Sequence, residues 1–494
     1  MAQSLPGEST TDAKTALAHS NSLSPEPEKR RDASAARPGS AGWLIPLAVV
    51  ALTGSALLAA PLLGWQIDAL VLAAVAGLGL VAAGVLLALW RFDAFILALL
   101  AVRPLVDGLP GGSQQAGLNP SAAVGLLFVM TSLVWLASRW RRGHLHRPSI
   151  ATAGAGALVV AAGLSCVVSR IPAESLNGTF RLFAAWLMFA VIEQLLADSE
   201  GFHRRLLVAL MLATGFVTVW ALVGIATGRA FADPFTGLLR ADGPFVHPNV
   251  LAKFLAIMVM PLIAYVLWDK GKQRAVAGAF LVPVLLALGL TYARVAWIAA
   301  AIGLAYLLSR VSWKFIPPLV AALVAAALLV PALRARIADL WAPAPSASAP
   351  ENSLIWRLQF WQELLDMNRV SPVNGIGLDT IPSLGNYSGL NAHNVWVQSY
   401  VEMGGVGLLA MALAVGAIGV ALHRGRGRVP HVRHHVAVAV GLTVLATTLT
   451  ENVLSETTTI WYAAVLMAAG WVAPQVFTSP SEKRGEQPAT IPET

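Results

Sequence analysis

The residues best suited to chemistry lie in the longest polar interruption of an otherwise apolar chain, from about Pro331 to Gly405. Within it, an apolar run restarts directly after His393, so this imidazole would lie where a helix enters a membrane. A histidine in that position can take a proton from a hydroxyl group of a membrane-bound substrate. We therefore predict that His393 is catalytic and that its neighbour Asn394 contacts the substrate.

Three arginines fall in polar segments that the topology described below predicts on the same side of the membrane. They are Arg240, Arg294 and Arg357, and the segment that starts at Arg240 also contains His247 and Asn249, two further candidates for substrate binding. Guanidinium groups match phosphate oxygens in a forked geometry and keep their charge. Directed at one place, they would bind the diphosphate of a lipid carrier and stabilise the negative charge of a leaving pyrophosphate. With a histidine as the base, this pattern predicts glycosyl transfer from a polyprenyl-diphosphate sugar to an acceptor hydroxyl.

Several of these polar residues also have a purely structural interpretation. His247 precedes Pro248 and could simply cap or anchor the start of a helix. Glu193 and Lys253 could mark an ion path, although pairing or snorkelling is the simpler interpretation. The other arginines predicted on the outer side are expected to snorkel to lipid headgroups, and they are Arg170, Arg229, Arg334, Arg336 and Arg369.

The sequence predicts neither a metal site nor a bound cofactor. No Asp-x-Asp pair occurs, and the carboxylates predicted on the outer side are scattered. The single cysteine, Cys166, lies within an apolar run, which excludes an intramolecular disulfide and a cysteine metal cage. A diphosphate leaving group neutralised by arginines would not need a metal ion.

Composition indicates an all-α, polytopic helical membrane bundle. The chain is 56% hydrophobic and 12% charged, with a mean hydropathy of +0.67, and its apolar stretches are near twenty residues long. The high pI of 9.9 does not indicate nucleic-acid binding, because no motif of that class occurs and the basic residues cluster in short loops.

The apolar runs predict about 14 membrane helices. They lie near 43–63, 67–90, 92–106, 121–138, 150–168, 179–197, 206–227, 249–268, 275–292, 295–309, 315–333, 396–421, 436–450 and 458–474. With the N-terminus inside, every strongly basic loop falls on the cytoplasmic side, as the positive-inside rule requires. The first apolar run begins only after residue 41, so a cleavable signal peptide is not expected.

These spans give a simple domain organisation with one large outer loop. We predict a disordered cytoplasmic tail at 1–40, eleven membrane helices in 41–333, a periplasmic catalytic loop at 334–395, three further membrane helices in 396–474 and a cytoplasmic tail at 475–494. Inside the loop, Leu354, Leu358, Trp361 and Leu365 form an apolar stripe at helical spacing, which predicts an amphipathic helix on the membrane surface.

Three segments together resemble the O-antigen ligase and polysaccharide polymerase superfamily. They are Gly243–Asn249, Tyr292–Trp297 and Ala392–Gly405, in a resemblance that covers roughly residues 120–470. One departure is Ala293, where the family often has serine before the arginine. The resemblance implies a metal-independent glycosyltransferase of the bacterial inner membrane, with a periplasmic active site and both termini in the cytoplasm.

The resemblance also implies roles for individual residues and partners. Arg240, Arg294 and Arg357 would bind the diphosphate of an undecaprenyl-diphosphate-linked oligosaccharide, and His393 would be the base or orient the acceptor. The acceptor would be another glycan or lipid A core, within a membrane that also holds the flippase and chain-length regulator of the same pathway.

The motifs leave three functional alternatives. A polymerase would join O-antigen or exopolysaccharide repeat units, and we favour it slightly over a ligase that transfers the finished glycan to lipid A core. A transporter of lipid-linked sugars is less favoured, because no clear internal repeat occurs and the notable charges lie at the outer interface. A purely structural partner would leave the convergent arginines unexplained.

Overall fold

The computed structural model describes residues 69–107, 120–233, 237–329, 334, 354–384 and 391–474. The two predicted tails, the predicted span at 43–63 and most of residues 330–353 lie outside these ranges. Most described residues are helical, and the strands β1 (Phe231–Ala232) and β2 (Leu239–Arg240) form one short antiparallel pair. The predicted all-α fold class is confirmed.

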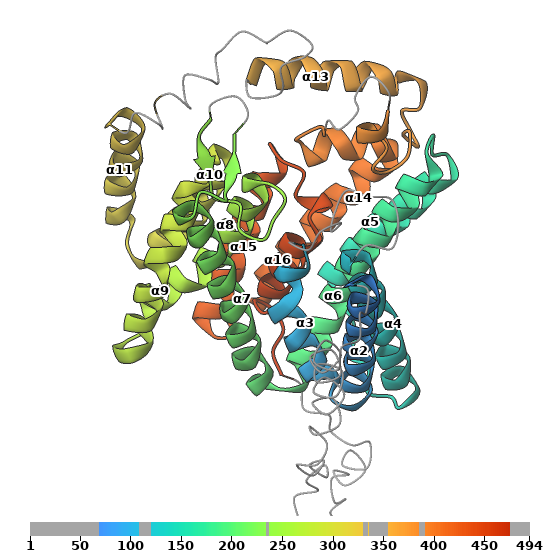
Figure 1. Cartoon of the computed structure of the whole chain (residues 1–494), viewed down its shortest axis with the longest axis horizontal. Coiled ribbons are helices and arrows are strands. Elements are labelled where there is room, and N and C mark those ends of the chain that lie inside the picture. The colour runs from blue at the N-terminus through green and yellow to red at the C-terminus, as the bar shows by residue number, and fades with distance from the viewer. Residues whose placement is uncertain are drawn as a thin grey trace, which may run out of the picture.

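The described helices follow the predicted order of apolar runs (Figure 1). They are α2 (Ala69–Trp90), α3 (Phe92–Asp107), α4 (Pro120–Arg141), α5 (Ile150–Val167), α6 (Pro172–Asp198), α7 (Glu200–Ala226), α8 (Pro248–Trp268), α9 (Gly271–Leu290), α10 (Arg294–Val311), α11 (Ile316–Leu329), α13 (Leu354–Met367), α14 (Val395–Gly425), α15 (His431–Thr448) and α16 (Thr457–Ala468). Short 3-10 turns join several of them, including η7 (Val453–Ser455) between α15 and α16.

Eight of the described helices, α4 to α10 and α14, are long and apolar enough to cross a membrane. Among the other helices at predicted spans, α3 has 16 residues and α16 has 12, so both are shorter than these eight. Several helices extend past the predicted bounds, as α6 does by starting at Pro172. Proline is favourable in the first turn, where a backbone N–H has no partner within the helix, so the helix begins before its apolar run.

Helix α8 forms the centre of the bundle. Its residues from Leu251 to Ala264 are almost all buried, and Trp461 and Tyr462 of α16 are fully buried in the same core. Small residues allow the close helix contacts that membrane bundles use. At Gly154 of α5, an added Cβ would lie only 2.4 Å from the Cβ of Ala417 in α14, so a larger residue would push these two helices apart.

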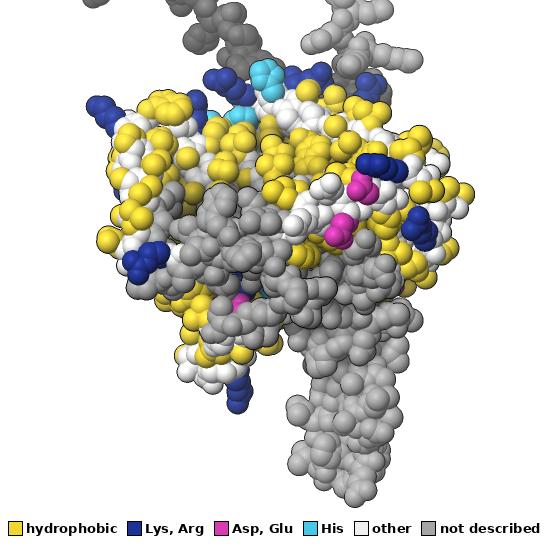
Figure 2. Space-filling view, turned by 90° about the horizontal axis from the view of Figure 1, so that it is seen from above, with side chains coloured by type: hydrophobic (Ala, Val, Ile, Leu, Met, Phe, Trp, Pro, Cys, Tyr) yellow, Lys and Arg dark blue, Asp and Glu magenta, His cyan; other side chains and the backbone are white. Residues whose placement is uncertain are grey.

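Helix α13 lies across one end of the bundle, which we call the α13 end (Figure 1). Phe360 and Leu364 dock it onto the protein in a small core that includes Val401 of α14. Two members of the predicted apolar stripe, Leu358 and Leu365, are instead 52% and 41% exposed. The helix therefore has two apolar faces, one packed on the protein and one turned away from it. Figure 2 shows the molecule from above, with Lys and Arg side chains mainly near the margin of the described surface.

The chain after α13 is fixed against a kink in α14. Gly404 interrupts that helix with φ of 66°, and an added Cβ there would lie 2.1 Å from the carbonyl oxygen of Val373. The backbone N–H of Gly405 donates to the carbonyl of Pro372 at 2.8 Å, and that of Gly377 donates to the carbonyl of Glu402 at 2.8 Å. Only glycine at position 404 allows this approach, so the kink holds the 372–381 loop in one place.

Candidate active site

A buried carboxylate, Glu451, lies at the centre of a charged group at the α13 end. It occupies the connection between α15 and α16 and is 5% exposed. Its Oε2 lies 3.4 Å from Nζ of Lys253 and 3.5 Å from Nδ1 of His393. Its Oε1 lies 3.5 Å from Nδ2 of Asn249 and 3.7 Å from a guanidinium nitrogen of Arg357. We call these five residues the Glu451 cluster, and they come from four segments far apart in the sequence.

The surrounding cations keep Glu451 ionised. Burial raises the pKa of a carboxyl group, but the charge of Lys253 and contacts from His393 and Arg357 outweigh it and hold the pKa of Glu451 below its ordinary value. Lys253 also pairs with Glu456, the next carboxylate along the chain. Burial raises the pKa of Glu456, and the charge of Lys253 opposes that rise. Glu451 is therefore the anion that the cluster is built around.

His393 is held in an unusual backbone conformation. Its φ of 48° is in the left-handed region, which is strained for a residue other than glycine. Helix α13 fixes the preceding residue, because Nε1 of Trp361 donates to the carbonyl of Ala392 at 2.6 Å. Within the described part of the chain, Nδ1 of His393 is buried and has no hydrogen bond, the 3.5 Å contact with Glu451 being long and electrostatic. The imidazole is thus oriented by a carboxylate yet not locked to it.

Arg357 joins α13 to the cluster. Its Nη1 donates to the carbonyl of Thr450 at 2.9 Å, beside its longer contact with Glu451. The surface helix therefore supplies a cation to the same place as His393.

Arg240 is buried and contacts residues of three segments. It donates through Nε to the carbonyl of Thr291 at 2.8 Å and through Nη2 to Oδ1 of Asn249 at 2.9 Å, and its Nη1 lies 3.2 Å from Asp233. These bonds tie the β1–β2 hairpin to the turn between α9 and α10 and to the start of α8. With so many of its donors engaged, Arg240 is placed to position Asn249 rather than to stand open to a ligand.

Arg294 is the first residue of α10 and is partly buried. It lies three residues after Thr291, whose carbonyl accepts from Arg240. Three residues span at most about 10 Å, so Arg294 lies at the edge of the same charged region.

His247 and Asn394 both cap helices. Nδ1 of His247 accepts from the backbone N–H of Asn249 at 3.1 Å at the start of α8, and its ring packs edge-to-face on Phe231. Oδ1 of Asn394 accepts from the backbone N–H groups of Trp396 and Val397 at the start of α14. Burial, with the charge of Arg240, lowers the pKa of His247 to about 4. At neutral pH this ring is therefore uncharged, and the capping interpretation describes its geometry.

Sequence reasoning missed Glu451 as the centre of the site and gave Lys253 no role in it, interpreting it as part of an ion path or as a paired or snorkelling residue. The signal for Glu451 was a lone carboxylate at the outer end of an apolar run. Lys253 and Glu451 are 198 positions apart, so no local sequence pattern predicts that they pair. Among the described residues, no three His, Cys, Asp or Glu side chains are grouped as metal ligands.

Comparison with known proteins bears on the middle of this site. Residues 279–412 match the family model described as O-antigen ligase. The matched segment contains Arg294, Arg357 and His393, while Lys253 and Glu451 lie outside it. No curated protein matches the chain. The match supports the resemblance to the O-antigen ligase and polymerase superfamily over this segment. The eight long apolar helices indicate a multi-pass membrane protein.

Proposed function

We propose that the protein transfers a glycan from an undecaprenyl-diphosphate-linked saccharide to a hydroxyl group of an acceptor sugar. The observation that carries this proposal is the Glu451 cluster, where a histidine, an arginine and a lysine surround one buried carboxylate. Its histidine and arginine come from the segment that matches the O-antigen ligase family.

In this proposal His393 is the general base. Its Nδ1 faces Glu451, which leaves Nε2 to accept the proton of the acceptor hydroxyl. The carboxylate then stabilises the imidazolium that forms. The acceptor oxygen forms a bond to the anomeric carbon, and the bond from that carbon to the diphosphate breaks, with its electron pair leaving on the phosphate oxygen. A single displacement of this kind inverts the anomeric configuration.

The cations at the edge of the cluster would stabilise the leaving diphosphate. Arg357 and Arg294 supply the forked donors that phosphate oxygens prefer, and Arg240 positions Asn249 beside them. Because fixed cations can neutralise the developing charge, we propose that the reaction needs no metal ion.

The distribution of charge supports a periplasmic site. Arg139, Arg205 and Arg424 lie in the terminal turns of α4, α7 and α14, at the ends opposite the α13 end, beside loops predicted to be basic and cytoplasmic. The Glu451 cluster would then face the periplasm from the inner membrane, with both termini in the cytoplasm.

Polymerisation of O-antigen or exopolysaccharide repeat units is the first candidate reaction. A ligase that transfers the finished glycan to lipid A core is the second, because the matching family is described as O-antigen ligase. In either case the flippase and chain-length regulator of the pathway would be partners in the membrane.

The test is reconstitution of the full chain in liposomes with an undecaprenyl-diphosphate oligosaccharide. Product size is measured without an added acceptor and again with lipid A core. A ladder without lipid A core identifies a polymerase, and a single product that requires lipid A core identifies a ligase. No product in either reaction, with the lipid crossing the bilayer instead, would contradict the proposal and support a transporter.

A further inference from the structure

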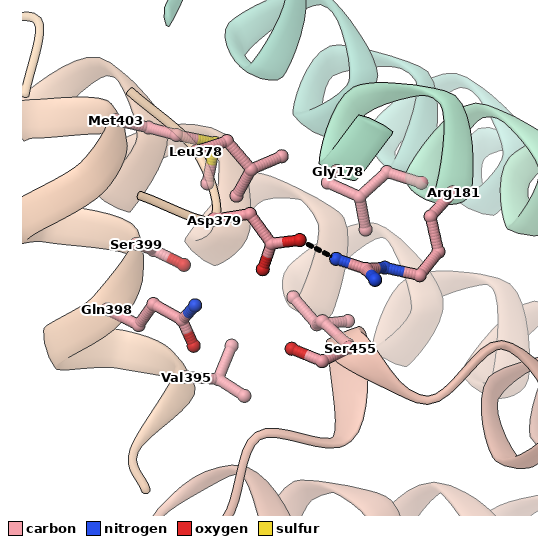
Figure 3. Close-up of a pocket in the computed structure, with 11 residues that line it drawn as sticks. Gly178, Arg181, Leu378, Asp379, Val395, Gln398, Ser399, Met403 and Ser455 are labelled. Atoms are coloured by element: carbon pink, nitrogen blue, oxygen red, sulfur yellow. Dashed lines mark hydrogen bonds and ion pairs between the residues drawn. The ribbon is translucent and has the colours of Figure 1, made fainter. Parts of the chain in front are cut away.

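A second polar site adjoins the Glu451 cluster at the α13 end. It is a small pocket between α6, the 372–381 loop, the first turns of α14 and η7 (Figure 3). Its polar lining residues are Arg181, Asp379, Gln398, Ser399 and Ser455. None of these five residues takes part in the proposed proton transfer or charge stabilisation.

An ion pair between Arg181 and Asp379 crosses the pocket (Figure 3). Both side chains keep some exposure, 24% and 15%, so a ligand can reach them. The backbone of Asp379 is held with φ of 63°, a conformation that is uncommon outside glycine and concentrates at functional sites. The preceding residue is fixed as well, because the Ser175 hydroxyl donates to the carbonyl of Leu378 at 2.9 Å. The carboxylate is therefore presented from a fixed backbone.

The chemistry of this pocket differs from that of the Glu451 cluster. Its one cation is neutralised by its one carboxylate, so it offers no excess positive charge for a diphosphate. Asp379, Gln398 and the two serines instead offer acceptors and donors that match neutral hydroxyl groups. Leu182, Leu378 and Val395 supply apolar wall, which suits the C–H faces of a sugar ring. This combination of a mostly apolar wall and a few fixed polar groups is typical of a small-ligand site.

The pocket shares two walls with the proposed catalytic group. Val395 lines it and lies two residues after His393, and two residues span at most about 7 Å. Ser455 lines it from η7, the turn that directly follows the segment holding Glu451. A sugar bound in this pocket would therefore lie beside the imidazole.

We propose that this pocket binds the acceptor sugar, with Asp379 and Arg181 bonding hydroxyl groups of the ring that presents its free hydroxyl to His393. This inference rests on the proposed glycosyl transfer and adds the acceptor subsite to it. Asp379 and Arg181 act here as binding residues that determine which sugar is accepted.

The test is the variant Asp379→Asn in the full-length protein. The probe is the repeat-unit oligosaccharide released from the lipid-linked donor and labelled with a fluorophore at its reducing end; core oligosaccharide labelled in the same way covers the ligase case. Binding is measured by fluorescence anisotropy, and transfer is measured by titrating probe and donor separately. We expect the dissociation constant and KM for one probe to rise at least about tenfold, which is about 1.4 kcal/mol, with the donor KM within about twofold.

The matched control is Asp366→Asn, which removes the α13 carboxylate of an exposed ion pair with Arg369. It should leave both binding and transfer unchanged. Asp379→Asn is expected to fold, because Asp379 and the buried Glu402 carboxylate repel one another. A second variant, Ser455→Phe, fills the pocket from η7 without touching the ion pair and should weaken probe binding in the same way.

Two results would overturn the inference. One is probe binding by Asp379→Asn and Ser455→Phe equal to that of the wild type, and the other is an equal rise in donor KM. A wild-type protein that binds a probe but transfers nothing would contradict the proposed function while supporting a sugar site here.

Discussion

Two buried glutamates at opposite ends of the bundle have very different surroundings. Glu193 of α6 is bonded by neutral donors at short distances, namely the Ser149 hydroxyl at 2.5 Å, the Thr152 hydroxyl at 2.7 Å and Nε1 of Trp471 at 2.8 Å. The nitrogen atoms around Glu451 lie at 3.4 to 3.7 Å, and three of its four partners are basic side chains.

This difference separates a structural carboxylate from a functional one. Short bonds from these three groups satisfy Glu193 and join the ends of α5 and α6 to the chain after α16, so no bonding position of Glu193 is left for a ligand. Charges at long distances leave Glu451 incompletely bonded, and such a site can rearrange around a substrate. The long contacts of the buried Glu451 therefore indicate that the reactive site lies at the α13 end.

The largest effect is expected for His393→Gln. The variant keeps a hydrogen-bonding side chain but cannot act as the base, so the transfer rate should fall by about 10²- to 10⁴-fold. Single-turnover transfer is measured beside binding of the lipid-linked donor, which should change little. The control is His423→Gln, an exposed histidine near the other end of α14. Equal transfer rates in His393→Gln and the wild type would contradict the proposal that the Glu451 cluster carries out the reaction.

A second large effect is expected for Arg294→Ala. Loss of this cation should reduce transfer by at least about 100-fold if it stabilises the leaving diphosphate. The protein should still insert and unfold at the wild-type temperature, because Arg294 is only partly buried at the start of α10. Transfer by purified protein is compared with its thermal unfolding in detergent. Retained transfer would restrict the leaving-group role to Arg357.

A moderate effect is expected for Arg357→Lys. Lysine keeps the charge but loses the forked donors that bond Thr450 and a phosphate together. The donor KM should rise by about tenfold, or about 1.4 kcal/mol. Arg369→Lys is the matched control, because Arg369 is 80% exposed on the same surface. If both variants raise the donor KM equally, general charge at the α13 end accounts for the effect and the cluster does not.

The smallest effect concerns acid sensitivity at the Glu451 end. Because the pKa of His247 is lowered from 6.5 to about 4, the unfolded chain binds this proton more tightly than the folded protein does. The stability that the neutral His247 contributes is complete above pH 6.5 and decreases as the pH falls towards 4. The loss reaches about 2 kcal/mol by pH 5. His247→Asn keeps a helix-capping oxygen and should lose less stability than the wild type between pH 7 and pH 5. Thermal unfolding at the two pH values measures this, and identical losses would refute it.

Much of the fold could be predicted from the sequence, because a bilayer requires long apolar helices and positive loops on one side. The face by which α13 docks was not predicted, since the helix carries apolar residues on two faces and only tertiary packing selects Phe360 and Leu364. For the site, His393 and Arg357 could be brought together by their place in the polar loop. Glu451 could not, because its pairing with Lys253 depends on how α8 meets the α15–α16 connection.

The most direct test of this account compares Glu451→Gln with Glu193→Gln as transfer per folded molecule. Both substitutions remove one buried negative charge with little change in shape, and thermal unfolding gives the stability of each variant. The account predicts that Glu451→Gln loses at least about 100-fold in transfer, whereas Glu193→Gln is less stable but transfers within about twofold of the wild type. Equal transfer per folded molecule in the two variants would contradict the assignment of Glu451 to the reaction.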